Sequence, residues 1–313
     1  MNKYKKIGLT ALAGSLVATS AFAGELGVSG SASINMEHTN GGAANSGKTF
    51  SIGNSVKFSG SGELDNGMTV SLSFELDQGD DETDVSGATA PFDSHSVKVS
   101  SDELGTLTFA GEGGSSAASS IDGTAAGDIW DTFDGARGSV VTADAVDDTA
   151  PGDNSLFYTL PAMVDGLDVN LSYQPQGSGR ESATGWGVSY TGIEGLTAQY
   201  ALTDEAGTTA ALSGDQTVWN VSYAIGPVTA TASNADFDVE TAANDQEMSS
   251  YALSYTVSDE ISITYGQEDI TEGGTSKVDA EYSALSASYT SGGMTISAAM
   301  KEGENVDQGT ATN

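Results

Sequence analysis

The sequence predicts an all-β protein: a transmembrane up-and-down antiparallel β-barrel, with 16 strands expected and about 15 of them present in this chain. Three observations predict this fold. Apolar and polar residues alternate in many short runs, short and long connections take turns between the runs, and tyrosines gather near the run ends. Together they are typical of strands that face lipid on one side and water on the other.

The first 23 residues are predicted to be a cleaved secretory signal peptide. MNKYKK supplies three lysines, IGLTALAGSLVATS is apolar, and AFA gives an A-x-A pattern before Gly24. A transmembrane anchor is the alternative, but the apolar run is short for a spanning helix of roughly 20 residues. We therefore expect residues 24–313 to be the exported, barrel-forming part.

The chain is strongly acidic and contains no cysteine. It has 10 Lys and Arg against 44 Asp and Glu, a formal net charge of −34. Such a charge argues against nucleic acid and anionic lipid surfaces as partners. It suits the attraction of cations, or solubility in salt.

Residues 68–76, MTVSLSFEL, show the alternation most clearly. Every second residue from Met68 to Leu76 is apolar, and the residues between them are Thr, Ser or Glu. Because successive side chains of a strand point to opposite faces, this run is a two-faced strand. The pattern recurs at 26–36, 50–58, 167–173, 186–190, 196–202, 219–225, 251–257, 261–265 and 294–300, with weaker copies at 95–99, 107–112, 155–160, 227–233 and 282–290.

The connections between the runs alternate in length. Short turns lie at 64–67, 101–105, 164–166, 192–195, 226–227, 258–260 and 291–293. Longer polar connections lie at 39–48, 77–93, 113–153, 175–183, 203–215, 238–247 and 270–280. An up-and-down meander gives this order when one rim has tight turns and the other has long loops.

A soluble β-sandwich would also alternate, but two features favour the membrane barrel. The strands have about the 9–11 residues that cross hydrocarbon at a tilt. The polar face is mostly Ser, Thr, Asn, Gly and Ala, which cannot fill a sandwich core but can line a wet lumen. The apolar face carries tyrosines that suit an interfacial girdle: Tyr158, Tyr173, Tyr190, Tyr200, Tyr223, Tyr255, Tyr265 and Tyr289.

The strand count is odd. If the exported chain starts at the periplasmic rim, the end KEGENVDQGTATN lies on the outer rim as an unfinished loop. Because bacterial single-chain barrels have even strand numbers, we expect that a C-terminal closing strand is missing. The alternative is that one strand has been split or merged in the count.

Residues 113–153 form the third long connection and do not alternate. Together with the start GVSGSASINM and the hairpin LDNGMTVSLSFEL, this connection carries a resemblance. The chain resembles the sixteen-stranded general porins of Gram-negative outer membranes, particularly the alphaproteobacterial type. The resemblance implies that the third loop folds inward and narrows the channel, with acidic side chains facing basic ones on the wall.

The resemblance assigns candidate residues to this constriction. The acidic loop members are Asp122, Asp128, Asp131 and Asp134. Their partners on the wall are Lys57 and Lys98, each on the polar phase of its strand. Two lysines are few for the family, so we expect a pore that attracts cations. The alternatives are a solvated surface loop and lumen lysines without a selective role.

Trp130 and Phe133 are large aromatic residues in a loop that consists mostly of small and acidic residues. Large aromatic side chains gain nothing in a flexible exposed loop, whereas a folded loop can pin them against a wall. We therefore expect both to be packing anchors of an inward loop rather than a stacking platform for ligands.

Other chemistry finds little support. The acidic run LDQGDDETD, 76–84, does not have the spacing of a calcium-binding EF-hand loop, and a solvated run is favoured. His38 and His95 sit in no catalytic motif, and there is no phosphate-binding loop or Cys/His cluster. We therefore expect no enzymatic activity, no cofactor and no metal.

The predicted function is passive diffusion of small hydrophilic solutes and ions, with cations favoured, through a porin of the cell outer membrane. Its expected partners are outer-membrane lipid, lipopolysaccharide, solutes and, from the resemblance, two further copies in a homotrimer. An exported acidic adhesin or surface-layer β protein without a pore is the alternative. A barrel with a plugged lumen, acting as a specific transporter or an anchor, is another.

Overall fold

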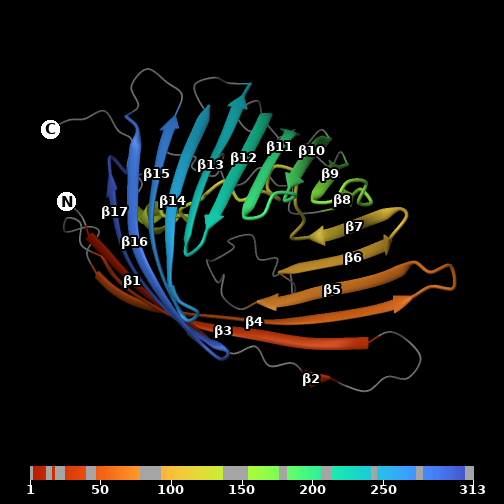
Figure 1. The fold of residues 1–313 in the computed structure, drawn as a ribbon, viewed down its shortest axis with the longest axis horizontal. Helices are drawn as coiled ribbons and strands as arrows, with labels where there is room; N and C mark the ends of the chain where they lie inside the picture. The colour runs from red at the N-terminus through yellow and green to blue at the C-terminus, as the bar shows by residue number, and fades with distance from the viewer. Residues whose placement is uncertain are drawn as a thin grey trace, which may run out of the picture.

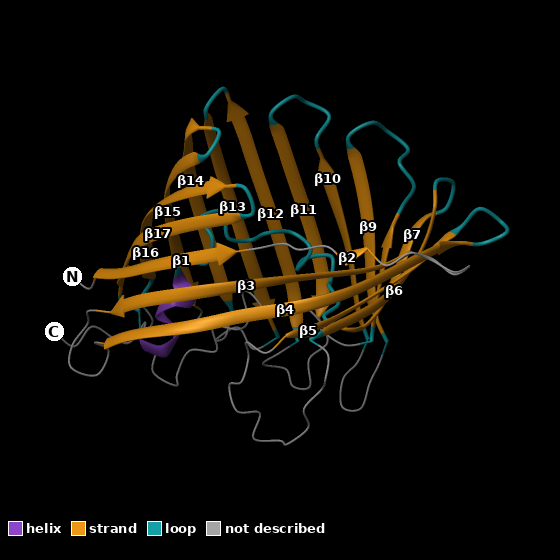
Figure 2. Ribbon diagram, turned by 90° about the horizontal axis from the view of Figure 1, so that it is seen from below, coloured by secondary structure: helices purple, strands orange, loops and turns teal. Residues whose placement is uncertain are grey.

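The computed structural model of the chain describes residues 3–11, 16–17, 25–39, 47–77, 93–136, 154–175, 182–205, 213–240, 245–272 and 278–306. Their strands form one antiparallel sheet that curls around a lumen (Figures 1 and 2). This confirms the predicted all-β fold class.

The fifteen predicted runs each fall on one strand from β3 to β17. The first seven of these strands are β3 (Glu25–Thr39), β4 (Gly47–Glu63), β5 (Thr69–Asp77), β6 (Ser94–Ser101), β7 (Gly105–Glu112), β8 (Ser155–Thr159) and β9 (Leu167–Gln174). The other eight are β10 (Ala183–Tyr190), β11 (Leu196–Glu205), β12 (Gly214–Ile225), β13 (Val228–Val239), β14 (Gln246–Ser258), β15 (Ile261–Glu272), β16 (Ala280–Ser291) and β17 (Met294–Glu304).

Several strand boundaries were wrong, because strands extend into the predicted connections at 39–48, 203–215, 238–247 and 270–280 and past the predicted end of the last strand. The sequence placed the last strand at 294–300 and assigned Lys301–Glu304 to an unfinished outer loop, but β17 continues through Glu304. Lys301 pairs with Ala284 of β16, and Glu302 pairs with Ser283. The strand continues because its backbone still has a hydrogen-bonding partner there, although the residues no longer alternate in polarity.

The leader residues also form strands, β1 (Lys3–Ala11) and the short β2 (Leu16–Val17). Each strand from β3 to β17 pairs with the next along the chain, and β1 pairs antiparallel with both β17 and β3. The ladder therefore runs on from β17 through β1 to β3 (Figure 2). Cleavage after residue 23 and a missing closing strand stay predictions.

The short connections are tight turns that depend on glycine. Gly105, Gly166 and Gly195 have φ angles of 76°, 74° and 79°, in the left-handed region that other residues rarely adopt. A Cβ at Gly195 would lie 2.5 Å from the carbonyl oxygen of Ala224. Glycine is therefore required at this turn for both space and conformation.

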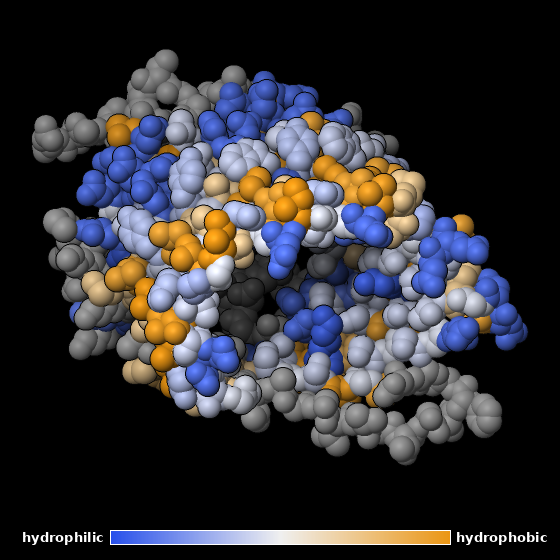
Figure 3. Space-filling model, in the orientation of Figure 1, coloured by the Kyte–Doolittle hydropathy of each residue, from blue (hydrophilic) through white to orange (hydrophobic). Residues whose placement is uncertain are grey.

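The outward face of the sheet is apolar. Large side chains that alternate along the strands are exposed there, among them Leu26, Ile52, Leu72, Val97, Leu171, Tyr223, Leu253, Tyr265, Leu285 and Met300. Figure 3 shows orange apolar side chains across the strands, with an opening between them. Exposure on this scale is typical of a surface that is covered by lipid or by another protein.

The inward face is lined by small hydroxyl side chains. Some bond directly across neighbouring strands: Ser31 with Ser55, Ser222 with Thr231, Ser254 with Thr264, Ser262 with Ser288, and Thr290 with Thr295, at 2.7–3.1 Å. Such side chains leave space and offer hydrogen bonds to water.

Within the described residues the only helix is η1, a 3₁₀ helix at Trp130–Ala136, drawn in purple in Figure 2. No helix in that part of the chain is long and apolar enough to cross a membrane.

Candidate pore constriction

Residues 113–136, hereafter the inner loop, lie inside the barrel rather than on its rim. The loop leaves β7 and follows the inner surface of the wall from β9 to β17, where lumen-facing side chains contact its backbone. The segment does not alternate because it is not part of the sheet.

The first half of the inner loop is fixed by three side chains of the wall. The Ala117 N–H donates to Ser172 Oγ of β9 at 2.9 Å, and the Ala118 N–H donates to Thr203 Oγ1 of β11 at 3.0 Å. Asn220 of β12 donates its Nδ2–H to a loop carbonyl at 2.8 Å. These wall residues are all buried, so the bonds are shielded from water.

The middle of the inner loop is fixed by two serines of the next two strands. Ser233 of β13 accepts from the Ala125 N–H at 2.8 Å and donates to the Gly123 carbonyl at 2.6 Å. Ser250 of β14 accepts from the Ala126 N–H at 2.8 Å. Successive strands thus each offer a polar side chain to successive backbone groups of the loop.

Small side chains allow this close approach. Ala117 and Ala118 are completely buried between the loop and the wall. A Cβ added at Gly266 of β15 would lie 2.6 Å from the Cβ of Ala126, so only glycine fits there. The Ala- and Gly-rich composition of the loop and the wall is therefore a packing requirement.

The end of the inner loop packs hydrophobic side chains against β14 to β17. Trp130 is 4% exposed and Phe133 is 1% exposed. The Phe133 ring packs against Tyr282 of β16, with ring centroids 5.3 Å apart, and lies over Gly303 of β17. Ile129, Met248 and Ile270 belong to the same cluster of buried side chains. The structure thus places both aromatic residues in the packing of an inward loop.

Two charged side chains contact this same end. Glu268 of β15 is fully buried, and its Oε2 accepts a hydrogen bond from the Trp130 N–H at 3.0 Å. Lys301 of β17 donates from Nζ to Thr132 Oγ1 at 2.6 Å and to the Asp128 carbonyl at 3.4 Å. Glu268 of β15 and Lys301 of β17 therefore both bind one turn of the loop.

The loop carboxylates are exposed in the lumen. Asp122, Asp128 and Asp131 are exposed, and the first two line a small cavity of about 150 Å³ beside Val218 of the wall. The Asp122 Oδ1 also accepts from the N–H and the hydroxyl of Thr124. Asp134 lies in η1, but its side chain, like Arg137, lies outside the described residues.

The two wall lysines lie on a different part of the barrel. Lys57 of β4 and Lys98 of β6 line a cavity of about 560 Å³ with serines of β4 to β6. Lys57 forms an ion pair with Glu75 of β5 at 3.6 Å. Within the described residues no hydrogen bond or ion pair joins either lysine to the inner loop.

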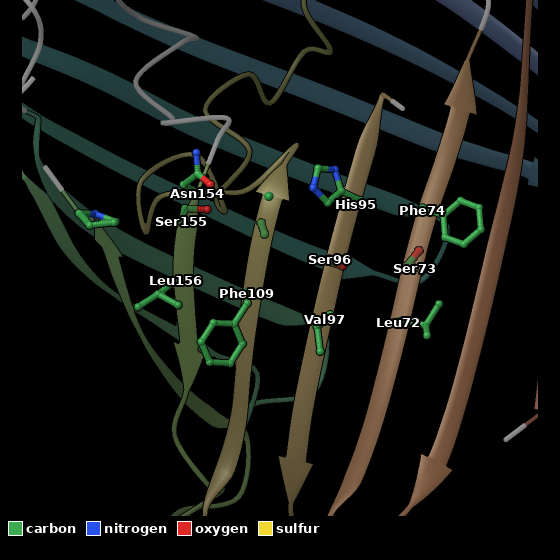
Figure 4. Close-up of a pocket in the computed structure, with 13 residues that line it drawn as sticks. Leu72, Ser73, Phe74, His95, Ser96, Val97, Phe109, Asn154, Ser155 and Leu156 are labelled. Atoms are coloured by element: carbon green, nitrogen blue, oxygen red, sulfur yellow. The ribbon is translucent and has the colours of Figure 1, made fainter. Parts of the chain in front are cut away.

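A further cavity, of about 660 Å³, lies over β5 to β8 (Figure 4). Its walls include the outward side chains Leu72, Val97, Phe109 and Leu156. His95 lies at its edge, 3.8 Å from the carboxylate of Glu112. Ser73, Ser96, Asn154 and Ser155 also line it.

The acidic run at 76–84 lies mostly outside the described residues. Within the part that the structure does describe, no group of three or more His, Asp or Glu side chains is placed to hold a metal ion.

Comparison with known proteins identifies the barrel. A family model described as Gram-negative porin matches residues 8–311. The chain belongs to the Gram-negative porin family. This porin is therefore an outer-membrane channel for small solutes, in a family of channels rather than enzymes.

Solved porin structures share the fold at low sequence identity. A porin refined at 1.8 Å resolution gives a TM-score of 0.56 at 15% identity, covering 97% of this chain and 100% of that chain. A triple mutant of Rhodopseudomonas blastica porin gives 0.53 at 15% identity, with 97% and 99% covered. A structure from work on asymmetric conductivity of engineered proteins gives 0.52, also at 15%, with 97% and 99% covered. No curated protein matches the chain significantly.

Sequence reasoning missed the residues that hold the inner loop of this porin. Glu268 could have been noticed, because it continues the polar phase of the strand predicted at 261–265, three residues beyond its predicted end. Lys301 was assigned to the wrong element. The sequence does not distinguish Ser233 and Ser250 from other lumen-facing serines, because the polar phases of the strands contain many of them.

Proposed function

We propose that this porin is a passive general-diffusion channel that favours cations, with the inner loop as its constriction. The observation that carries the proposal is the position of Asp122, Asp128 and Asp131, exposed on a loop that lies inside the lumen. Carboxylates that line a narrow part of a pore attract cations and repel anions. The hydroxyl-lined wall suits small hydrophilic solutes, which pass without turnover or cofactor.

The positive charges of the wall offset these carboxylates only in part. Lys57 is paired with Glu75, whereas Lys98 lines the same cavity as Lys57, and Lys301 keeps its charge beside Thr132 of the loop. The excess of acidic over basic residues along the whole chain also favours cations.

Reversal potential in a planar bilayer under a potassium chloride gradient tests the cation preference. We expect a potential of the sign set by cation flow, which moves toward zero when Asp128→Asn and Asp131→Asn are combined. The matched control combines Asp165→Asn with Asp259→Asn, which removes the same charge from exposed turns. An anion-selective potential, or equal shifts in the two double variants, contradicts the proposal.

We further propose that the exported protein starts near Gly24 and assembles as a homotrimer in contact with lipid and lipopolysaccharide. The apolar outward face supports a covering of lipid or of further copies. The trimer and the cleavage site rest on the porin resemblance and on the leader pattern. Native mass spectrometry of protein extracted from outer membranes measures both, and a monomer or an intact leader contradicts the corresponding part.

A further inference from the structure

The outward face of β5 to β8 carries a groove that has no part in the proposed pore. It is the cavity of about 660 Å³ in Figure 4, a size within the roughly 300–1,000 Å³ of sites that bind small ligands. Directly opposed side chains form its apolar row: Leu72 pairs with Val97, and Val97 pairs with Phe109. Phe109 in turn pairs with Leu156. Leu72, Val97 and Phe109 are each 44% or 45% exposed, so large apolar side chains stay open along the groove.

A β-bulge explains why the outward face is hollow here. The pairing of β6 with β7 shifts register between His95 and Ser96, and a bulge bends its strand locally. The outward residue of β7 at this level is Gly111, which has no side chain. A Cβ at Gly111 would collide with the His95 ring. The imidazole therefore occupies the space over Gly111, at the end of the groove nearest the long connections.

This end of the groove is polar. His95 Nδ1 lies 3.8 Å from Glu112 Oε2, and both side chains are partly exposed. Asn154 lines the same end, above the apolar row in Figure 4. The groove thus has an imidazole, a carboxylate and an amide at one end and only apolar side chains in the row below them. An amphiphile has the same division into a polar head and an apolar chain.

We propose that this groove binds one acyl chain of a zwitterionic phospholipid, with the headgroup at His95 and Glu112. An imidazole N–H can donate to a lipid phosphate, and the Glu112 carboxylate can accept from an ammonium group. Glu112 repels a purely anionic headgroup, and so does a chain with a formal net charge of −34. A headgroup that carries both charges therefore fits this end best.

A flexible acyl chain fits the groove better than a second copy of the protein does. Protein interfaces require complementary shapes, and the apolar face of another barrel would bridge the hollow and leave its floor empty. The stacked rings of Phe58 and Phe74, with centroids 4.9 Å apart, form a rigid edge beside the groove. A chain of rotating methylene groups can follow that edge and contact the row below it. Since the groove lies on the face opposite the inner loop, its occupant does not depend on the proposed pore.

Native mass spectrometry tests the site on protein that is loaded with palmitoyl-oleoyl phosphatidylethanolamine and then stripped stepwise with detergent. We expect one lipid per chain to remain after the others have been removed. Val97→Trp fills the groove and should lower the lipid-bound fraction several-fold. The matched control is Val221→Trp, which changes an outward valine of β12, away from the groove, that is 39% exposed. Far-UV circular dichroism verifies that each variant is folded.

Histidine variants test the headgroup end. His95→Gln should lower lipid retention, whereas His38→Gln, on the outward phase of β3, should not. Equal retention in these two variants overturns the headgroup assignment, and so does equal or better retention of phosphatidylglycerol or lipid A, which are anionic.

Three results overturn the groove itself as a lipid site. One is a natural protein that retains no lipid, and another is equal loss in Val97→Trp and Val221→Trp. The third is an oligomer that Val97→Trp alone dissociates, because a second copy then covers the groove. Since lipid retention is measured without current, none of these results bears on conductance, and a protein without conductance leaves the groove untouched.

Discussion

Ser233 shows what one residue does in this barrel. Its hydroxyl accepts from the Ala125 N–H and donates to the Gly123 carbonyl, and the side chain is 1% exposed. No sequence pattern separates it from the other lumen serines, because its partners lie 108 and 110 residues away. Its role could be recognised only from the folded chain.

Ser233→Ala should therefore loosen the inner loop more than an ordinary serine substitution does. Two partly buried backbone groups lose their partner, at a cost of up to about 1–3 kcal/mol for each group that water does not reach. The measurement is the frequency of current transitions in single channels, together with the midpoint of thermal unfolding in detergent. We expect more transitions and a lower midpoint.

The control for Ser233→Ala is Ser254→Ala. The Ser254 hydroxyl bonds Thr264 of the next strand and does not touch the inner loop. Equal transition frequencies in the two variants would show that the loop does not depend on Ser233.

At the scale of the strands, alternation alone was a reliable guide. The runs at 68–76 and 251–257 have two clear faces, and both became strands with the expected register of apolar side chains outward. The pattern failed where polarity stopped alternating although pairing continued, as at Lys301–Glu304 of β17. It also gave no information on β4 before Phe50, where the strand begins at Gly47.

The outward face also carries carboxylates directly opposite one another near the ends of the strands. The cross-strand pairs are Asp204 with Asp215, Asp236 with Glu247, Asp269 with Glu281, and Glu281 with Glu304. Like charges at directly opposed positions destabilise a sheet. The strand ends therefore stay paired although the opposed carboxylates repel one another.

Glu247→Gln should raise the thermal unfolding midpoint of the barrel at low ionic strength. The amide keeps an acceptor for the Asn234 Nδ2–H and removes the repulsion of Asp236, a gain of about 0.2–1 kcal/mol. Because salt screens exposed charges, the gain should shrink as salt is added. Calorimetry at two salt concentrations measures both effects.

Glu63→Gln is the control, since Glu63 is an exposed acid that pairs with Thr69 rather than with another carboxylate. A gain of the same size in this variant, or a gain in Glu247→Gln that does not depend on salt, would contradict the repulsion.

At the scale of the whole molecule, short turns on one rim and long connections on the other define the topology. Both are visible in the sequence, as are the position of the third long connection and its acidic and aromatic residues. The docking of that connection on β9 to β17 is not visible, because it depends on single polar contacts between residues far apart in the chain. The porin resemblance, rather than periodicity, predicted that the loop turns inward.

The central claim is that the chain encloses a water-filled pore narrowed by the inner loop. Single-channel conductance in a planar bilayer with molar potassium chloride tests it most directly, on the protein and on a variant in which 115–136 is replaced by a short Gly-Ser linker. We predict uniform, ohmic current steps that become larger in the variant. Absence of current from folded protein, or steps of the same size in both, would contradict the claim.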